Sequence, residues 1–181
     1  MTKKIEEIVR KEAGEPDWNY HIAPVRKYAL RLATKYGANK QVVEVAALLH
    51  DIGRIKYGPK NHEETGAEEA KKILIKYKYN QKIIDDVLYC IRSHKGADGV
   101  QPKTIEAEIL INADAMAHFN VLPLFFYDRD ANVPFAERIA WVEKKITNGW
   151  KRKLTLKESR KMTQEKYQAI KLILKSIKDL V

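Results

Sequence analysis

The chain has 181 residues, a length that favours one domain, and neither its lysine-rich start nor any later stretch resembles a secretory signal or a membrane span. Its single cysteine, Cys90, excludes an internal disulfide framework and suits a reducing compartment, so we expect a cytoplasmic protein without a membrane partner. The net charge of +10 suits anionic partners, although solvated lysine-rich helices give the same excess.

Helical periodicity runs along the whole chain and predicts an all-α fold. Apolar residues recur at spacings of three and four, whereas the alternation typical of strands is nearly absent. The first helix is predicted over residues 3–13 and the second from about residue 17 or 22 to residue 36, with Gly37 as its stop. His21 is in line with the core-facing residues of the second helix, so we expect its imidazole to face the interior.

Residues 42–53, VVEVAALLHDIG, are predicted to form a helix that is buried on all sides. Only Glu44 interrupts the apolar run before His50 and Asp51, and we predict that Gly53 ends the helix in a left-handed cap. A buried carboxylate is costly unless it is paired or binds a metal, so the adjacent His and Asp suggest a metal site. For an isolated His-Asp dipeptide, a hydrogen-bonded pair without metal is the alternative.

The next two predicted helices each carry a histidine at one end. Asn61 opens the first of them and, with Glu64, is predicted to form a capping box that leaves His62 in the first turn. The other helix covers about residues 81–93 and places His94 at the end of its apolar face.

The following helix, which Thr104 is predicted to cap, contains an aspartate within its apolar face. This residue, Asp114, is as hard to explain in a core as the His-Asp pair. The C-terminal third, about residues 121–181, is predicted to add helices without obvious chemistry. We therefore expect a single domain over 1–181, with its core at about 18–120.

Six residues thus end or interrupt a buried apolar face or open a helix beside a loop. They are His21, His50, Asp51, His62, His94 and Asp114. One buried histidine is more often a core residue with its own hydrogen-bond partner than a metal ligand. Six separate partners would be needed here, whereas a shared metal satisfies the whole set.

The order of these residues, together with three local motifs, resembles the HD superfamily of metal-dependent phosphohydrolases. The motifs HDIGR, NHEETGAEEAKKIL and PKTIEAEILINADAM are similar to those of small stand-alone HD hydrolases, and the resemblance covers roughly residues 18–120. It implies an HD-domain helical bundle. It also implies that His21, His50, Asp51 and Asp114 hold one metal and that His62 and His94 hold a second, bridged by Asp51.

Mixed imidazole and carboxylate ligands suit one or two Mn²⁺, Fe or Co²⁺ ions better than Mg²⁺. Two cations ~3.5–4 Å apart can clamp a phosphate and activate a water. We therefore predict a catalytic role for Asp51, and phosphate-binding roles for Arg54 and Lys95. Solvated charges at helix ends are the alternative for these two cations. His118, one helical turn after Asp114, is either a substrate-contacting residue or an ordinary core residue.

These features predict a phosphohydrolase that cleaves a phosphate ester or anhydride of a small substrate, preferably a nucleotide. The GYP motif of cyclic-dinucleotide hydrolases and the extended acidic motif of guanosine tetraphosphate hydrolases are both missing from the expected places. An HD-type di-iron oxygenase is the first alternative. The second, less favoured, is a basic nucleic-acid-binding module with a structural metal, suggested by the net charge and by Lys151, Arg152 and Lys153. The oligomeric state is not specified by the sequence.

Overall fold

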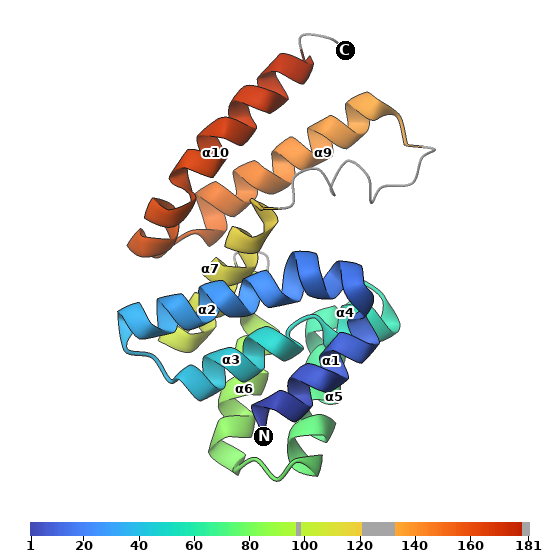
Figure 1. Cartoon of the computed structure of the whole chain (residues 1–181), viewed down its shortest axis with the longest axis vertical. Coiled ribbons are helices and arrows are strands. Elements are labelled where there is room, and N and C mark those ends of the chain that lie inside the picture. Colours follow the sequence, from blue (N-terminus) through green and yellow to red (C-terminus); the bar gives the residue numbers. More distant parts are fainter. Residues whose placement is uncertain (97–98, 121–132, 179–181) are drawn as a thin grey trace.

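The computed structural model describes residues 1–96, 99–120 and 133–178, and every regular element in these ranges is helical (Figure 1). The all-α prediction is therefore confirmed. The elements are α1 (Thr2–Asp17), the π-helical turn η1 (Trp18–Ile22), α2 (Ala23–Tyr36), α3 (Lys40–Leu49), α4 (Ile52–Tyr57), α5 (His62–Lys76), α6 (Gln81–Ser93), α7 (Ile105–His118), α9 (Phe135–Asn148), the π-helical turn η3 (Gly149–Lys153) and α10 (Lys157–Lys178).

Helices α1 to α6 gather into one body, and α7 leads from it to α9 and α10, which lie side by side (Figure 1). We call α9, η3 and α10 the C-terminal extension. Among the described residues, no helix is both long and apolar enough to cross a membrane.

Helix α3 forms the centre of the core. It begins where the side chain of Asn39 accepts hydrogen bonds from the backbone N–H groups of Gln41 and Val42. Its run from Val45 to Leu49 is wholly buried, and α3 packs against α1, α2, α6 and α7. The helix buried on all sides that the sequence predicts is therefore present, and it delivers its C-terminal end to the middle of the molecule.

The backbone breaks at the His-Asp pair, as expected, but Gly53 is not the cause. Asp51 lies between α3 and α4 with φ −102° and ψ 7°, whereas Gly53 lies inside α4. The predicted left-handed cap is wrong because Gly53 serves the crossing of α4 and α5. A Cβ atom there would lie 2.4 Å from the backbone nitrogen of Gly66 and 2.4 Å from the carbonyl oxygen of His62.

Helix α5 begins at His62, as expected, but without the predicted capping box. Asn61 adopts a left-handed conformation (φ 50°, ψ 32°), and its side chain makes no capping hydrogen bond. The carboxylate of Glu64 instead accepts a hydrogen bond from Nε of Arg92 at 2.9 Å. The side chain of Glu64 therefore contacts α6 and takes no part in a capping box. The backbone N–H of Glu64 still donates a hydrogen bond to the carbonyl oxygen of Asn61.

A buried amide fastens the C-terminal extension to α7. Oδ1 of Asn112 accepts hydrogen bonds from the backbone N–H of Leu156 (3.1 Å) and the hydroxyl of Ser159 (2.5 Å). Its Nδ2 donates to the hydroxyl of Thr155 at 2.9 Å and to a backbone carbonyl of α7. Asn112 is fully buried and its amide is satisfied on both sides. It therefore fixes the junction of η3 and α10 to a point on α7 that is two residues before Asp114.

Candidate metal centre

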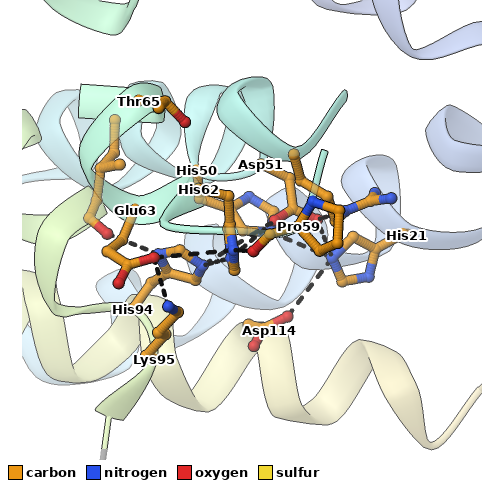
Figure 2. A network of polar contacts seen from close by, with 12 residues as sticks. His21, His50, Asp51, Pro59, His62, Glu63, Thr65, His94, Lys95 and Asp114 are labelled. Atoms are coloured by element: carbon orange, nitrogen blue, oxygen red, sulfur yellow. Dashed lines mark hydrogen bonds and ion pairs between the residues drawn. The ribbon is translucent and has the colours of Figure 1, made fainter. Parts of the chain in front are cut away.

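The six residues that the sequence singles out converge on one centre (Figure 2). They are His21 from η1, His50 and Asp51 from the break between α3 and α4, His62 from the first turn of α5, His94 from the end of α6, and Asp114 from α7. His21 and His62 keep 13% and 16% of their side-chain surface exposed, so solvent reaches the centre, while the other four side chains are buried.

Four of these residues surround one point and are called the first cluster: His21, His50, Asp51 and Asp114. Nε2 of His21 lies 3.2 Å from Nε2 of His50, 3.3 Å from Oδ2 of Asp51 and 3.5 Å from Oδ1 of Asp114. Nε2 of His50 lies 3.7 Å from the same oxygen of Asp51. His21, His50 and Asp51 form one group that can hold a metal, and Asp114 joins it through His21, with which Asp114 and His118 form an overlapping group.

The other oxygen of Asp51 faces the second cluster, which consists of Asp51, His62 and His94. Oδ1 of Asp51 lies 3.8 Å from Nε2 of His62 and 4.0 Å from Nε2 of His94, and the two nitrogens are 3.0 Å apart. These three atoms form a second group that can hold a metal. Asp51 therefore presents one oxygen to each cluster.

The backbone orients three of the imidazoles in the same way, through the carbonyl three residues earlier. Nδ1 of His50 bonds the carbonyl oxygen of Ala47 (2.9 Å) and Nδ1 of His62 that of Pro59 (2.9 Å). In the same way, Nδ1 of His94 bonds the carbonyl oxygen of Ile91 (2.6 Å). A donor at Nδ1 leaves Nε2 of a neutral ring with a lone pair directed at its cluster. Where two such lone pairs meet, at His62 and His94, a cation between them relieves their repulsion.

Both carboxylates of the centre are held in their ionised form. Burial raises the pKa of Asp51, but the neighbouring imidazoles of His50 and His21 and the charge of Arg54 outweigh it, and the pKa lies well below its usual value. Burial likewise opposes ionisation of Asp114, and Lys153 is the largest influence that brings its pKa well below the usual value. Both groups are therefore available as anionic ligands at neutral pH.

The histidines of the two clusters differ in their pKa. Burial lowers the pKa of His50, and it lowers that of His94 to about 4, so both rings are neutral at pH 7. Burial also acts on His21, but the hydrogen bond and charge of Asp51, joined by the charge of Asp114, raise its pKa above 6.5. His21 is thus the ring most inclined to hold a proton when no cation is bound.

Arg54 contacts Asp51 and a second carboxylate that the sequence does not single out, and its phosphate-binding role stays a prediction. Its Nε donates to Oδ2 of Asp51 at 2.8 Å and its Nη2 to Oδ1 of Asp17 at 2.9 Å. Asp17 stands at the end of α1, beyond the break at Gly14 (φ 70°). No local pattern marks it, because only tertiary folding brings α1 to α4.

Lys95 lies at the side of the second cluster. Its Nζ is 2.5 Å from Oε2 of Glu63, and this oxygen lies 3.8 Å from Nδ1 of His62. The lysine keeps 31% of its side chain exposed. A phosphate-binding role for Lys95 stays a prediction, and an ion pair with Glu63 already accounts for part of its charge.

Two further residues approach the first cluster through Asp114. Nζ of Lys153 lies 3.1 Å from Oδ2 of Asp114, and Nδ1 of His118 lies 3.8 Å from Oδ1. The His118 ring also stacks on His21 at 5.0 Å between centroids. From the sequence, Lys153 is only one member of a basic run, because its place beside Asp114 depends on how η3 folds back on α7.

Comparison with known proteins identifies the region that holds these residues. The family model of the HD domain matches residues 19–118. Curated relatives include the tRNA (cytidine(56)-2'-O)-methyltransferase of Picrophilus torridus, which is 32% identical over 108 residues, or 52% of this chain and 29% of that protein. Ribonuclease Y of Alkaliphilus metalliredigens is 34% identical over 99 residues, or 54% and 19%. The chain therefore spans less than a third of the length of either relative.

The similar solved structures match nearly the whole length of this chain, whereas these relatives match about half of it. Bacillus subtilis YpgQ in complex with ADP has a TM-score of 0.76 at 18% identity, over 99% of this chain and 94% of that chain. A predicted HD superfamily hydrolase from an uncultured Thermotogales bacterium has a TM-score of 0.63 at 25% identity, over 99% and 92%. At 18% identity, the first similarity supports the fold alone.

Proposed function

The chain belongs to the HD-domain family, and we propose that it is a metal-dependent phosphohydrolase acting on a phosphate ester or anhydride of a small substrate. The observation that carries the proposal is the position of Asp51, with Oδ2 facing the first cluster and Oδ1 facing the second. A carboxylate between two groups of ligands suits a pair of cations that hold one phosphate between them.

Bound cations would supply Lewis-acid stabilisation of the phosphoryl oxygens and a water of lowered pKa. The chain contributes imidazoles and ionised carboxylates, a ligand set that suits Mn²⁺, Fe or Co²⁺. Arg54 holds Asp51 in place through Nε, and its guanidinium, 33% exposed, offers further N–H donors to a phosphoryl oxygen. Lys95 adds a half-buried charge beside the second cluster.

A nucleotide is the substrate that we favour. One similar structure, YpgQ, is a complex with ADP, and the relatives named ribonuclease Y and tRNA methyltransferase act, by their names, on RNA. Those two proteins are much longer than the matched region, so their RNA substrates need not apply to this chain. A small nucleotide better suits a centre whose ligands are mostly buried, and a nucleic acid is therefore the less favoured partner.

The test is release of phosphate or pyrophosphate from a panel of nucleotides by Mn²⁺-loaded protein, with Asp51→Asn beside the wild type. Asp86→Asn is the matched control, since this exposed carboxylate on α6 pairs with Lys82 at 3.0 Å, away from the centre. We expect turnover in the wild type and the control and none in Asp51→Asn. Absence of turnover on every phosphate ester or anhydride by folded, metal-loaded wild type would reject the proposal.

The same six ligands also suit an HD-type di-iron oxygenase, which is the second candidate. The cations beside the centre, Arg54, Lys95 and Lys153, favour an anionic substrate and hence the hydrolase. Iron-dependent consumption of O₂ with an organic substrate, without release of phosphate, would favour the oxygenase over the hydrolase.

A further inference from the structure

We propose that Lys153, from the C-terminal extension, forms a phosphate-binding subsite beside the first cluster. The identity of the ligand rests on the proposed function, whereas the placement of Lys153 does not. The extension would then be part of the active centre, although the ligands of both clusters lie in η1 and in the segment from the end of α3 to α7.

Lys153 contacts Asp114, a carboxylate of the first cluster. Asp114 turns Oδ1 toward Nε2 of His21 (3.5 Å) and Oδ2 toward Nζ of Lys153 (3.1 Å). An ammonium group has three donors, so Lys153 can keep its bond to Asp114 and still donate to a phosphoryl oxygen. It retains 23% side-chain exposure, which leaves it accessible to such a ligand.

The stem of Lys153 passes close to the chain that leaves α6 before it reaches Asp114 on α7. A Cβ atom at Gly96, just after His94 and Lys95, would lie 3.8 Å from Cγ of Lys153. The ammonium itself is held by the ion pair with Asp114. A lysine held in this way loses less conformational entropy on binding an anion than a free surface lysine would.

Lys145 on α9 is a second half-buried lysine of the extension, with its Nζ 5.4 Å from the centroid of the Trp141 ring. Burial lowers its pKa, the charges of Asp114 and Asp51 oppose this effect, and Lys153 and Arg54 add to it, with a net lowering. Lys153 and Arg54 each contact a carboxylate of the centre, and divalent ions would add to the positive potential there, which an incoming anion would relieve.

The network around Asn112 makes this arrangement rigid. It holds the side-chain hydroxyl of Thr155 and the backbone N–H of Leu156 against α7, only two and three residues after Lys153. Sites of this kind bind more tightly when the groups are held in place before the ligand arrives. The subsite therefore depends on a buried hydrogen-bond network, in contrast to the exposed Lys151 of the same turn.

A purely structural lysine that orients Asp114 is the competing explanation, and affinity for metal distinguishes the two. Lys153 competes with a cation for the charge of Asp114, so its removal should leave Mn²⁺ binding unchanged or stronger if Asp114 is held by its other contacts. If Lys153 only positioned the carboxylate, its removal would weaken Mn²⁺ binding.

The experiment measures binding of Mn²⁺, and then of inorganic phosphate to the Mn²⁺-loaded full chain, by titration calorimetry. The variants are Lys153→Met, Lys145→Met, Lys153→Arg and the control Lys151→Met, which removes the same charge from the same turn. We expect Lys153→Met to weaken phosphate binding about tenfold, the scale of one charge-assisted hydrogen bond, and Lys145→Met to weaken it less. Lys153→Arg should restore most of the affinity, and Lys151→Met should match the wild type. Thermal unfolding of each variant verifies the fold.

Phosphate affinity that is equal in Lys153→Met and Lys151→Met would overturn the subsite, as would weaker Mn²⁺ binding in Lys153→Met or no phosphate binding by the wild type. The proposed function fails separately. Protein that binds phosphate through Lys153 but hydrolyses no phosphate compound would reject only the hydrolase, and hydrolysis that tolerates Lys153→Met with an unchanged KM would reject only the subsite.

Discussion

The two clusters share Asp51 but are built differently. The first takes its ligands from η1, from the end of α3 and from α7, and it includes a second carboxylate, Asp114. The second takes its two histidines from α5 and α6, which are neighbours in the chain, and has no carboxylate of its own. The first cluster should therefore hold its cation more tightly, because it has more ligands and more negative charge. The second leaves more coordination positions for water and substrate.

Asp51→Asn should have the largest effect, because it removes the residue common to both clusters. The amide cannot supply an anionic oxygen to either side, so we expect both ions to be lost and turnover to fall roughly a thousandfold or more. Metal content by mass spectrometry and nucleotide turnover measure the two effects. One full equivalent of metal retained by the variant would show that the first cluster does not need Asp51 and would break the comparison.

The six residues of the centre can be singled out from the sequence because their signal is local, and their role as metal ligands stays a prediction. A charged or polar residue within an otherwise apolar helical face has few explanations, and this applies to Asp114 as it does to the pair at the end of α3. The ends of helices α2, α6 and α7 also follow from local signals, such as Gly37 in the left-handed conformation (φ 67°) and the side-chain cap of Thr104.

What the sequence does not predict depends on contacts between distant segments. Gly53 is compatible with a helix stop or with a close crossing of helices, and only the approach of α5 selects the second. Lys153 and Asp17 are ordinary surface residue types whose partners lie 39 and 37 positions away. The aromatic residues Phe125, Phe126 and Tyr127, expected in a core or an interface, lie outside the described residues.

Gly53→Ala should damage the second cluster selectively. The added Cβ would collide with the backbone of the first turn of α5, at His62 and Gly66, where no side-chain rotation can relieve the contact. We expect a loss of about 3 kcal/mol in the free energy of unfolding and loss of the second ion before the first. Urea unfolding and metal titration measure these effects.

The matched control for Gly53→Ala is Gly37→Ala. Gly37 has a left-handed backbone conformation (φ 67°), but a Cβ there meets nothing within 4 Å, so the cost should be only about 1 kcal/mol with both ions retained. Equal effects of the two substitutions would contradict the crossing as the reason for Gly53.

Asn112→Ala should affect the first cluster, at the place where the C-terminal extension meets it. It leaves the backbone N–H of Leu156 without its acceptor in a buried place, whereas the hydroxyl of Ser159 keeps the carbonyl oxygen of Leu156 as its acceptor at 2.7 Å. We expect a loss of about 2 kcal/mol in the free energy of unfolding, and phosphate affinity closer to that of Lys153→Met than to wild type. Asn120→Ala, at an exposed amide that bonds Tyr28, is the control and should cost less than about 1 kcal/mol.

The smallest expected effect concerns metal-free protein, in which His21 and His94 should contribute with opposite signs to the pH dependence of the free energy of unfolding. For His94, the folded pKa of about 4 lies below the unfolded value of about 6.5, so the unfolded chain binds a proton first. Its share of stability is complete above pH 6.5 and is lost as the pH falls toward 4, at about 1.4 kcal/mol per unit. For His21, the folded pKa is raised, so its share is complete below pH 6.5 and is lost as the pH rises through the folded pKa.

Urea unfolding in the presence of a chelator, from pH 5 to pH 8, separates these two contributions when His94→Gln and His21→Gln are compared with wild type. The His94 variant should lose less stability than wild type on acidification, and the His21 variant should lose more. Parallel curves for the two variants would mean that both rings titrate alike. The carboxylates would then not distinguish the clusters before a cation binds, and the tighter binding expected at the first cluster would have to come from its number of ligands alone.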